Sequence, residues 1–214
     1  MQAGEIRAFD DLRHSLTNKG VRVSSPNTLP TWDIIAQQGY AIADQPRDWG
    51  IGVNDQESAY KHHPVRPEHA DLDAVALRSP ADGKLYGFTP RTQLFGSVAS
   101  VMHYNIFSRV LVVIVNRALG IPAVCYVDDY AFLDPLSLGV APMRAFHQLT
   151  DLIAIKIEKR KCKFAQTNNY LGVEGDMPSR AKGMQLSVRL PAEKAKKWTQ
   201  LVADFLPADS IGQT

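Results

Sequence analysis

The fold is decided by the stretch Ile121-Pro-Ala-Val-Cys-Tyr-Val-Asp-Asp-Tyr-Ala-Phe-Leu133, in which two adjacent carboxylates interrupt an otherwise apolar run. The residues on either side are rich in β-branched and aromatic types, so 122–126 and 130–133 are predicted to be paired strands. Unpaired charges among buried strands are costly, so a cation is expected close to Asp128 and Asp129. The alternative is a plain Asp-Asp turn, since aspartate favours turns.

A third acid lies upstream, at the end of a run that alternates apolar and small residues from Trp49 to Asp55. This alternation predicts a strand with Asp55 in line with Trp49, Ile51 and Val53. A hairpin with acids at its tip, facing an acid on a neighbouring strand, suits a two-Mg²⁺ site for phosphoryl transfer. We therefore expect the three carboxylates to converge.

The rest of the chain predicts strands and helices without strict alternation, which indicates an α+β fold. Expected strands are Ile6–Phe9, Ala74–Arg78 and Lys84–Thr89 around a Ser-Pro-Ala-Asp-Gly turn, Tyr170–Val173 and Met184–Leu190. Expected helices run from Thr28 or Thr31 to Ile42, from a Ser97 cap to Leu119 before Gly120, from Pro142 to Leu152, and from Pro191 with an apolar stripe at Ala195, Trp198, Val202 and Phe205.

The composition is that of an ordinary globular protein: 214 residues, 45% hydrophobic and 21% charged. The longest apolar run, 110–115, is too short to cross a membrane, and Met1–Asp11 has no signal-peptide core. Cys125 and Cys162 support neither a disulfide framework nor a zinc site. An intracellular setting, cytoplasmic or nuclear, is expected.

Positive charge is concentrated in the C-terminal third. Residues 1–150 have 13 lysines and arginines against 15 acids, whereas residues 155–200 have 11 against 4. Such a segment suits contact with a phosphate backbone, although a solvated basic face is the simpler interpretation.

Several motifs, in order along nearly the whole chain, resemble those of reverse transcriptases. Val53-Asn-Asp55 with Ala59 and Tyr60 is similar to motif A, Leu94-Phe-Gly-Ser97 with its helix to motif B, and Tyr126-Val-Asp-Asp129 to motif C. Lys161-Cys-Lys-Phe164 and Tyr170-Leu-Gly172 resemble motifs D and E of retrotransposon enzymes, Arg7-Ala-Phe-Asp10 the fingers, and Val188-Arg-Leu-Pro191 the start of a thumb.

The resemblance implies an RNA-directed DNA polymerase that takes an RNA or DNA template, a DNA primer, dNTPs and Mg²⁺, or Mn²⁺ in its place. Asp55 and Asp128 would hold the metal, with Asp129 in a less direct part. The backbone carbonyl of Gln56 would be a further metal ligand, and Tyr60 would be a steric gate against a ribose 2′-hydroxyl. Phe95 and Gly96 would lie beside the nucleotide and the template. Arg7 would bind the triphosphate, and Lys161 would protonate the leaving pyrophosphate. The alternatives are a core aromatic for Tyr60, a helix lead-in for Gly96, a surface arginine for Arg7 and a contact with the nucleic-acid backbone for Lys161.

The sequence departs from the usual motifs at Leu94, where proline commonly precedes the Phe-Gly pair, and at Asn54, where a β-branched or apolar residue is common. It departs from the retroviral pattern at Phe95, where those enzymes have glutamine. The match therefore favours long-terminal-repeat or DIRS-like retrotransposon enzymes. Rival interpretations are an RNA-dependent RNA polymerase, which the aromatic Tyr60 disfavours, a nucleic-acid-binding remnant without catalysis, and an unrelated α+β domain.

The resemblance also implies a right-hand polymerase fold, in which the palm is an antiparallel sheet with helices on one face. Residues 1–48 are expected to be partial fingers, 49–61 palm, 62–93 the connection between fingers and palm, 94–188 palm, and 189–214 the start of a thumb. Because Arg7 lies so close to the start, a partial enzyme is expected, one that binds primer–template weakly and leaves an apolar patch on its last helix. Its oligomeric state is not indicated.

Overall fold

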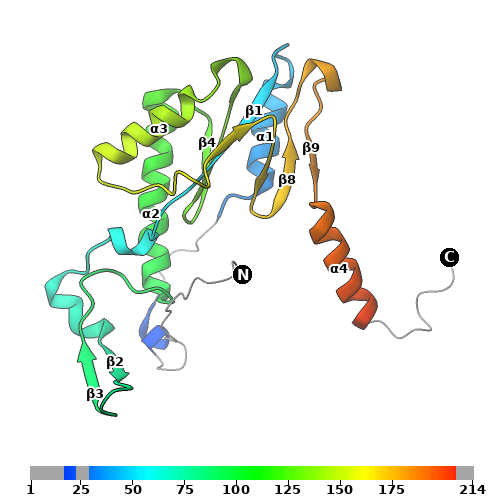
Figure 1. Cartoon of the computed structure of the whole chain (residues 1–214). Coiled ribbons are helices and arrows are strands. Elements are labelled where there is room, and N and C mark those ends of the chain that lie inside the picture. The colour runs from blue at the N-terminus through cyan, green and yellow to red at the C-terminus, as the bar shows by residue number, and fades with distance from the viewer. Residues whose placement is uncertain (1–16, 23–28, 206–214) are drawn as a thin grey trace.

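A four-stranded antiparallel sheet lies at the centre of the computed structural model, which describes residues 17–22 and 29–205 (Figure 1). Its strands are β1 (Trp49–Asp55), β4 (Ala123–Tyr126), β5 (Asp129–Pro135) and β6 (Lys163–Ala165), in the order β4-β5-β1-β6. The two predicted strands flanking Asp128 are thus confirmed as neighbours, and the strand ending at Asp55 lies beside them. The expected strand Ile6–Phe9, with Arg7, lies outside the described residues.

Each face of this sheet buries its own apolar cluster, because side chains alternate along the strands. On one face, α2 (Val98–Ile114) and α3 (Ala141–Leu152) pack through residues such as Leu111 and Phe146 onto Phe132. On the other face, α1 (Trp32–Ala43) packs through Ile35 onto Ile51. The α+β palm-like architecture predicted from the sequence is confirmed, but helices were expected on one face of the sheet only, and α1 covers the second face because Ile51, Ala131 and Leu133 present an apolar surface there.

Gly52 leaves room on β1 for the Phe132 ring of the neighbouring strand, on the face covered by α2 and α3. A Cβ added there would lie 2.3 Å from the Phe132 ring, on the strand position directly opposite. Phe132 is almost fully buried, so its ring has little room to move. The alternation of Gly50 and Gly52 with large residues in β1 therefore reflects close packing rather than strand propensity.

Gly52→Ala is accordingly expected to lower the free energy of unfolding by about 1–3 kcal/mol, the usual cost of overpacking a core. Urea unfolding followed by circular dichroism measures this loss. Gly87→Ala is the matched control, because its added Cβ meets nothing within 4 Å. Equal stability of the two variants would contradict the packing argument.

The helices begin and end largely where the sequence predicts. α1 follows Thr31, and α2 continues through a π-helical turn, η4 (Val115–Leu119), before Gly120 ends it with a φ of 67°. Together α2 and η4 form the one segment of the described chain long and apolar enough to span a membrane, by length and composition alone. The expectation that no segment is long enough rested on the run 110–115 alone, and the apolar helix is longer than that run. Leu111 and Val115 on this helix are buried against the sheet.

A second, three-stranded antiparallel sheet differs from the two strands predicted for this part of the chain. Its strands are β7 (Thr167–Tyr170), β8 (Val173–Asp176) and β9 (Ser187–Arg189). Leu171 and Gly172, expected inside a strand, instead form a two-residue turn in which both have positive φ, the pattern of a type I′ hairpin. The strand predicted over Met184–Leu190 shortens to β9, since Met184 also has a positive φ.

Two elements project away from the central sheet in Figure 1. The hairpin of β2 (Val75–Arg78) and β3 (Leu85–Phe88) is the predicted one, and α4 (Ala192–Phe205) is the predicted terminal helix. Trp198 is 59% and Phe205 86% exposed, and Val202 is exposed as well, which confirms the expected apolar patch. Short helical turns complete the described chain: η1 (Thr17–Gly20), η2 (Ala59–His62), η3 (Pro67–Asp73), η5 (Leu136–Leu138) and η6 (Arg180–Lys182).

Candidate active site

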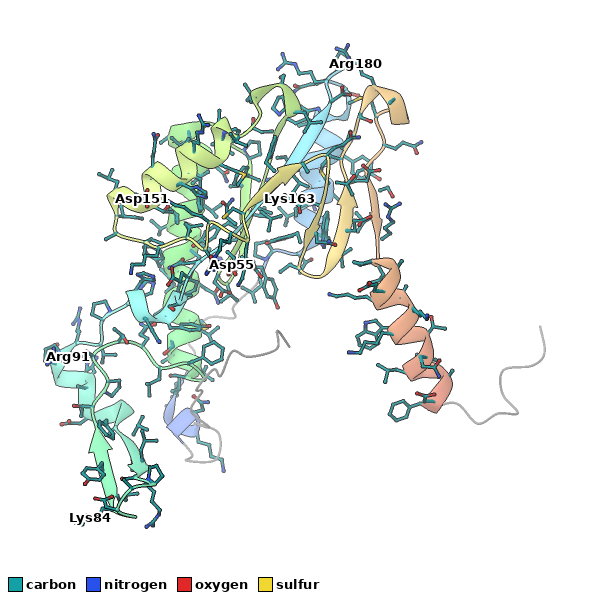
Figure 2. The ribbon with its side chains drawn as sticks, in the orientation of Figure 1. Asp55, Lys84, Arg91, Asp151, Lys163 and Arg180 are labelled. Carbon is teal, nitrogen blue, oxygen red and sulfur yellow. The ribbon has the colours of Figure 1, made fainter. Side chains whose placement is uncertain are left out.

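Asp55 and Asp129 lie directly opposite each other at one end of the central sheet. Asp55 is the last residue of β1 and Asp129 the first of β5, and the two are cross-strand partners. Directly opposed side chains in an antiparallel pair have Cβ atoms about 4.5–5.5 Å apart, and like charges there repel. Figure 2 shows Asp55 near the centre of the molecule, well away from Lys84 at the hairpin tip.

Asp128 lies on the two-residue turn that joins β4 to β5. Tyr126 pairs with Asp129, so Val127 and Asp128 are the two central residues of the turn. Val127 has a φ of 55°, whereas Asp128 is not among the residues of positive φ, which matches a type II′ turn. Glycine is preferred where valine stands, and such a conformation costs a β-branched residue roughly 1–3 kcal/mol.

The negative charge of this strand end shows in the titration of Asp129. Burial, followed by the charges of Asp128 and then Asp55, raises the pKa of Asp129 to about 6, and Lys161 opposes the shift. Lys161 forms an ion pair with Asp55 through its Nζ atom. One lysine therefore neutralises only part of the charge that three acids would carry at neutral pH.

The donor chemistry of this strand end fits a hard divalent cation, because Mg²⁺ prefers carboxylate oxygens. Within residues 17–22 and 29–205, however, no three His, Cys, Asp or Glu side chains are grouped closely enough to hold a metal ion. Lys161 donates to the Asp55 carboxylate. The three-aspartate metal set therefore stays a prediction.

The segment after α3 brings Lys161 to Asp55. Gln56 and Ile157 form an antiparallel bridge, in which the Glu158 amide donates to the Asp55 carbonyl at 2.9 Å. A turn then follows, closed by the Lys161 amide and the Glu158 carbonyl at 2.9 Å. Two segments more than a hundred residues apart in the sequence thus meet at the predicted site.

Gln56 contacts the Asp128 turn through its backbone and α2 through its side chain. Its backbone N–H donates to the Asp128 carbonyl at 3.1 Å, and its buried side-chain oxygen accepts from the hydroxyl of Tyr104. The bridge to Ile157 uses the carbonyls of the flanking residues, so the Gln56 carbonyl takes no part in it. Its predicted use as a metal ligand is untested.

Tyr60, Phe95 and Gly96 come together beside the acids. The Tyr60 ring packs edge-on against Phe95, at 5.5 Å between centroids, and against Tyr104, at 5.3 Å. Burial, and secondarily the charge of Asp128, raises the pKa of the Tyr60 hydroxyl. Phe95 is 61% exposed, and Gly96 is exposed with a φ of 99°, so this corner presents an aromatic ring and a glycine backbone to solvent.

The start of α2 is capped differently from the sequence prediction. Ser97 occupies the N-cap position, but its side chain makes no capping hydrogen bond. Asn18, 80 residues away, accepts from the Val98 amide and donates to the Gly96 carbonyl, both at 3.0 Å. Local spacing suggested Ser97, and the sequence has no signal for a cap this distant.

Asn54, the unusual residue before Asp55, has a structural partner. It is fully buried, and its side-chain oxygen lies 2.8 Å from Nε2 of His147 on α3. Burial lowers the pKa of His147, which favours the neutral ring that can donate one hydrogen bond. A polar residue is thus accommodated where an apolar one was expected.

Comparisons with known proteins support the fold. No protein-family model and no curated protein sequence matches the chain. Among solved structures, a foamy viral protease–reverse transcriptase in complex with double-stranded DNA has a TM-score of 0.63 at 16% identity, covering 92% of this chain and 30% of that one. A telomerase from Candida albicans, in complex with a fragment of telomeric RNA, has a TM-score of 0.51 at 12% identity, covering 77% of this chain and 34% of its own.

The chain therefore has the polymerase palm-like fold shared by reverse transcriptases and telomerase. It spans about a third or less of the length of the structures that it matches. At these identities the likeness establishes architecture, and the chemistry of the site must be argued from its own residues.

Proposed function

We propose that this chain is the catalytic palm, with partial fingers and the start of a thumb, of an RNA-directed DNA polymerase from a long-terminal-repeat or DIRS-like retroelement. The observation that carries the proposal is the position of Asp55 opposite Asp129, next to the Asp128 turn, at the end of a palm-like sheet. The reaction is in-line attack of a primer 3′-oxygen on the α-phosphate of a dNTP, with pyrophosphate as the leaving group.

Asp55 and Asp128 would hold Mg²⁺ or Mn²⁺, together with the Gln56 carbonyl. When bound, such ions supply activation of the 3′-oxygen and neutralisation of the triphosphate charge. Lys161, already beside Asp55, is expected to contact the phosphates or to protonate the pyrophosphate. Arg7 is expected to pair with the triphosphate as well.

Partners follow from charge and from the neighbours' complexes. Three of the similar solved structures are complexes, with double-stranded DNA, an RNA/DNA hybrid and telomeric RNA. This supports nucleic-acid binding by the same fold here. The basic segment after α3 borders the acidic strand end through Lys161 and Lys163, and α4 adds Lys194, Lys196 and Lys197. Phosphate contacts of this kind make binding strongly salt-dependent.

Primer extension tests the proposal on matched RNA and DNA templates, with dNTPs or rNTPs, at low ionic strength. Addition of dNTPs on an RNA template is the expected result. Addition of rNTPs alone would favour an RNA-dependent RNA polymerase instead. Binding of primer–template by folded protein without any addition would indicate a remnant that binds nucleic acid.

Tyr60 is expected to set the choice between dNTPs and rNTPs. Tyr60→Ala should raise the rNTP/dNTP ratio of incorporation by about 10- to 100-fold, the range that one steric contact can supply. Tyr60→Phe is the matched control, because it keeps the ring that packs on Phe95 and Tyr104. Single-nucleotide addition measures the ratio, and an unchanged ratio in Tyr60→Ala would show that the ring is only a core aromatic.

A further inference from the structure

The turn that carries Asp128 is held at both of its central carbonyls. The Val127 carbonyl accepts from the hydroxyl of Ser108 on α2 at 2.9 Å, and the Asp128 carbonyl accepts from the Gln56 amide at 3.1 Å. The second bond comes from the backbone and survives any substitution at position 56 except proline. The first depends on one side chain.

Ser108 makes that bond from a buried position next to two tyrosine hydroxyls. Its side chain is fully buried, and its oxygen accepts from the Tyr130 hydroxyl at 3.3 Å. A hydroxyl has a single proton, so with Tyr130 as donor the Ser108 proton is directed to the Val127 carbonyl. The bond thus ties α2 to the residue whose backbone conformation is the least favourable in the turn.

We propose that Ser108 is a positioning residue that holds Val127 in the left-handed conformation and thereby directs the Asp128 carboxylate. The inference rests on the proposed function, since it assigns a catalytic consequence to the direction of Asp128. Without the Ser108 bond, valine is free to leave its positive φ, and the peptide that leads into Asp128 rotates with it. Tyr104 and Gln56 complete the polar support beneath the turn.

Kinetics of single-nucleotide addition test this with two substitutions and their combination. Ser108→Ala removes the bond to Val127 and the one accepted from Tyr130, and is expected to lower kcat by about 10-fold with little change in the KM for dNTP. Val127→Gly should recover most of that loss in the double variant, because glycine adopts the turn conformation without help. Ser179→Ala, which deletes another buried hydroxyl at a site away from the turn, should leave kcat unchanged.

Hydrogen exchange provides a readout that does not depend on activity. The peptide spanning residues 124–130 should exchange about 10-fold faster in Ser108→Ala, and Val127→Gly should restore its protection in the same background. If the unsubstituted chain adds no nucleotide, the proposed function fails while this exchange measurement still decides the role of Ser108. If the effects of Ser108→Ala and Val127→Gly are additive in the double variant, in either measurement, the proposal is overturned and Ser108 is a packing residue.

Discussion

Asp128→Asn is expected to abolish nucleotide addition, lowering its rate by at least about 10³-fold. A carboxylate that holds the catalytic cation contributes several kcal/mol to transition-state stabilisation, and an amide does not replace its charge. The fold should survive, because the substitution removes one of the charges that raise the pKa of Asp129. Loss of activity is therefore expected without loss of stability.

Single-turnover addition of one dNTP measures the effect, with thermal unfolding as the check on folding. Asp151→Asn is the matched control, since Asp151 is an exposed acid on α3 whose partner is Lys159. Figure 2 shows Asp151 on the helical layer, apart from Asp55. More than about a tenth of the parent rate remaining in Asp128→Asn would remove Asp128 from the catalytic machinery, because that loss is under 1.4 kcal/mol.

The second large effect concerns pH and the stability of the cation-free protein. The pKa of Asp129 is about 6 in the folded chain against an ordinary aspartate value of 3.8, so folding favours the protonated form. Its contribution to stability is present below about pH 3.8 and is lost as the pH rises through 6. Asp129→Asn should therefore stabilise the protein at pH 7 by about 1–2 kcal/mol, because solvent screens this partly exposed group, and have little effect near pH 4.

Asp134→Asn separates this effect from simple burial. Burial alone raises the pKa of Asp134 to about 6, so its substitution should produce a similar pH profile. Mg²⁺ should shrink the stability difference caused by Asp129→Asn, because a cation neutralises the same charge, but not the difference caused by Asp134→Asn. Urea unfolding between pH 4 and 8, with and without Mg²⁺, gives both comparisons, and an equal response of the two variants would argue against a cation at the strand end.

Much of the palm was predictable because its signals are local. Alternation in β1, the apolar run around Asp128, and the breaker residues Gly120 and Pro191 set element boundaries within one or two residues of the structure. The juxtaposition of Asp55 and Asp129 followed from motif order, and the structure makes them cross-strand partners. Local periodicity and motif spacing were sufficient for these features.

What the sequence did not predict depends on contacts between distant segments. Asn18 caps α2 from 80 residues away, and His147 explains Asn54 from 93 residues away. A signal did exist for the hydrogen bonds to the turn, since Ser100, Tyr104 and Ser108 recur every four residues on one face of a largely apolar helix. Polar residues at that spacing on a buried face indicate hydrogen-bond partners across the interface. The Leu171-Gly172 turn was missed because leucine rarely adopts a positive φ.

Cation binding is the measurement that tests the central claim most directly, because it does not depend on regions outside this chain. Crystals of the chain soaked in millimolar Mn²⁺ can be examined by anomalous scattering at the manganese edge. We expect an anomalous peak between the carboxylates of Asp55 and Asp128, with Lys161 displaced from Asp55. The peak should be lost in Asp128→Asn. An ordered strand end with no manganese there, and Lys161 still paired with Asp55, would contradict this expectation.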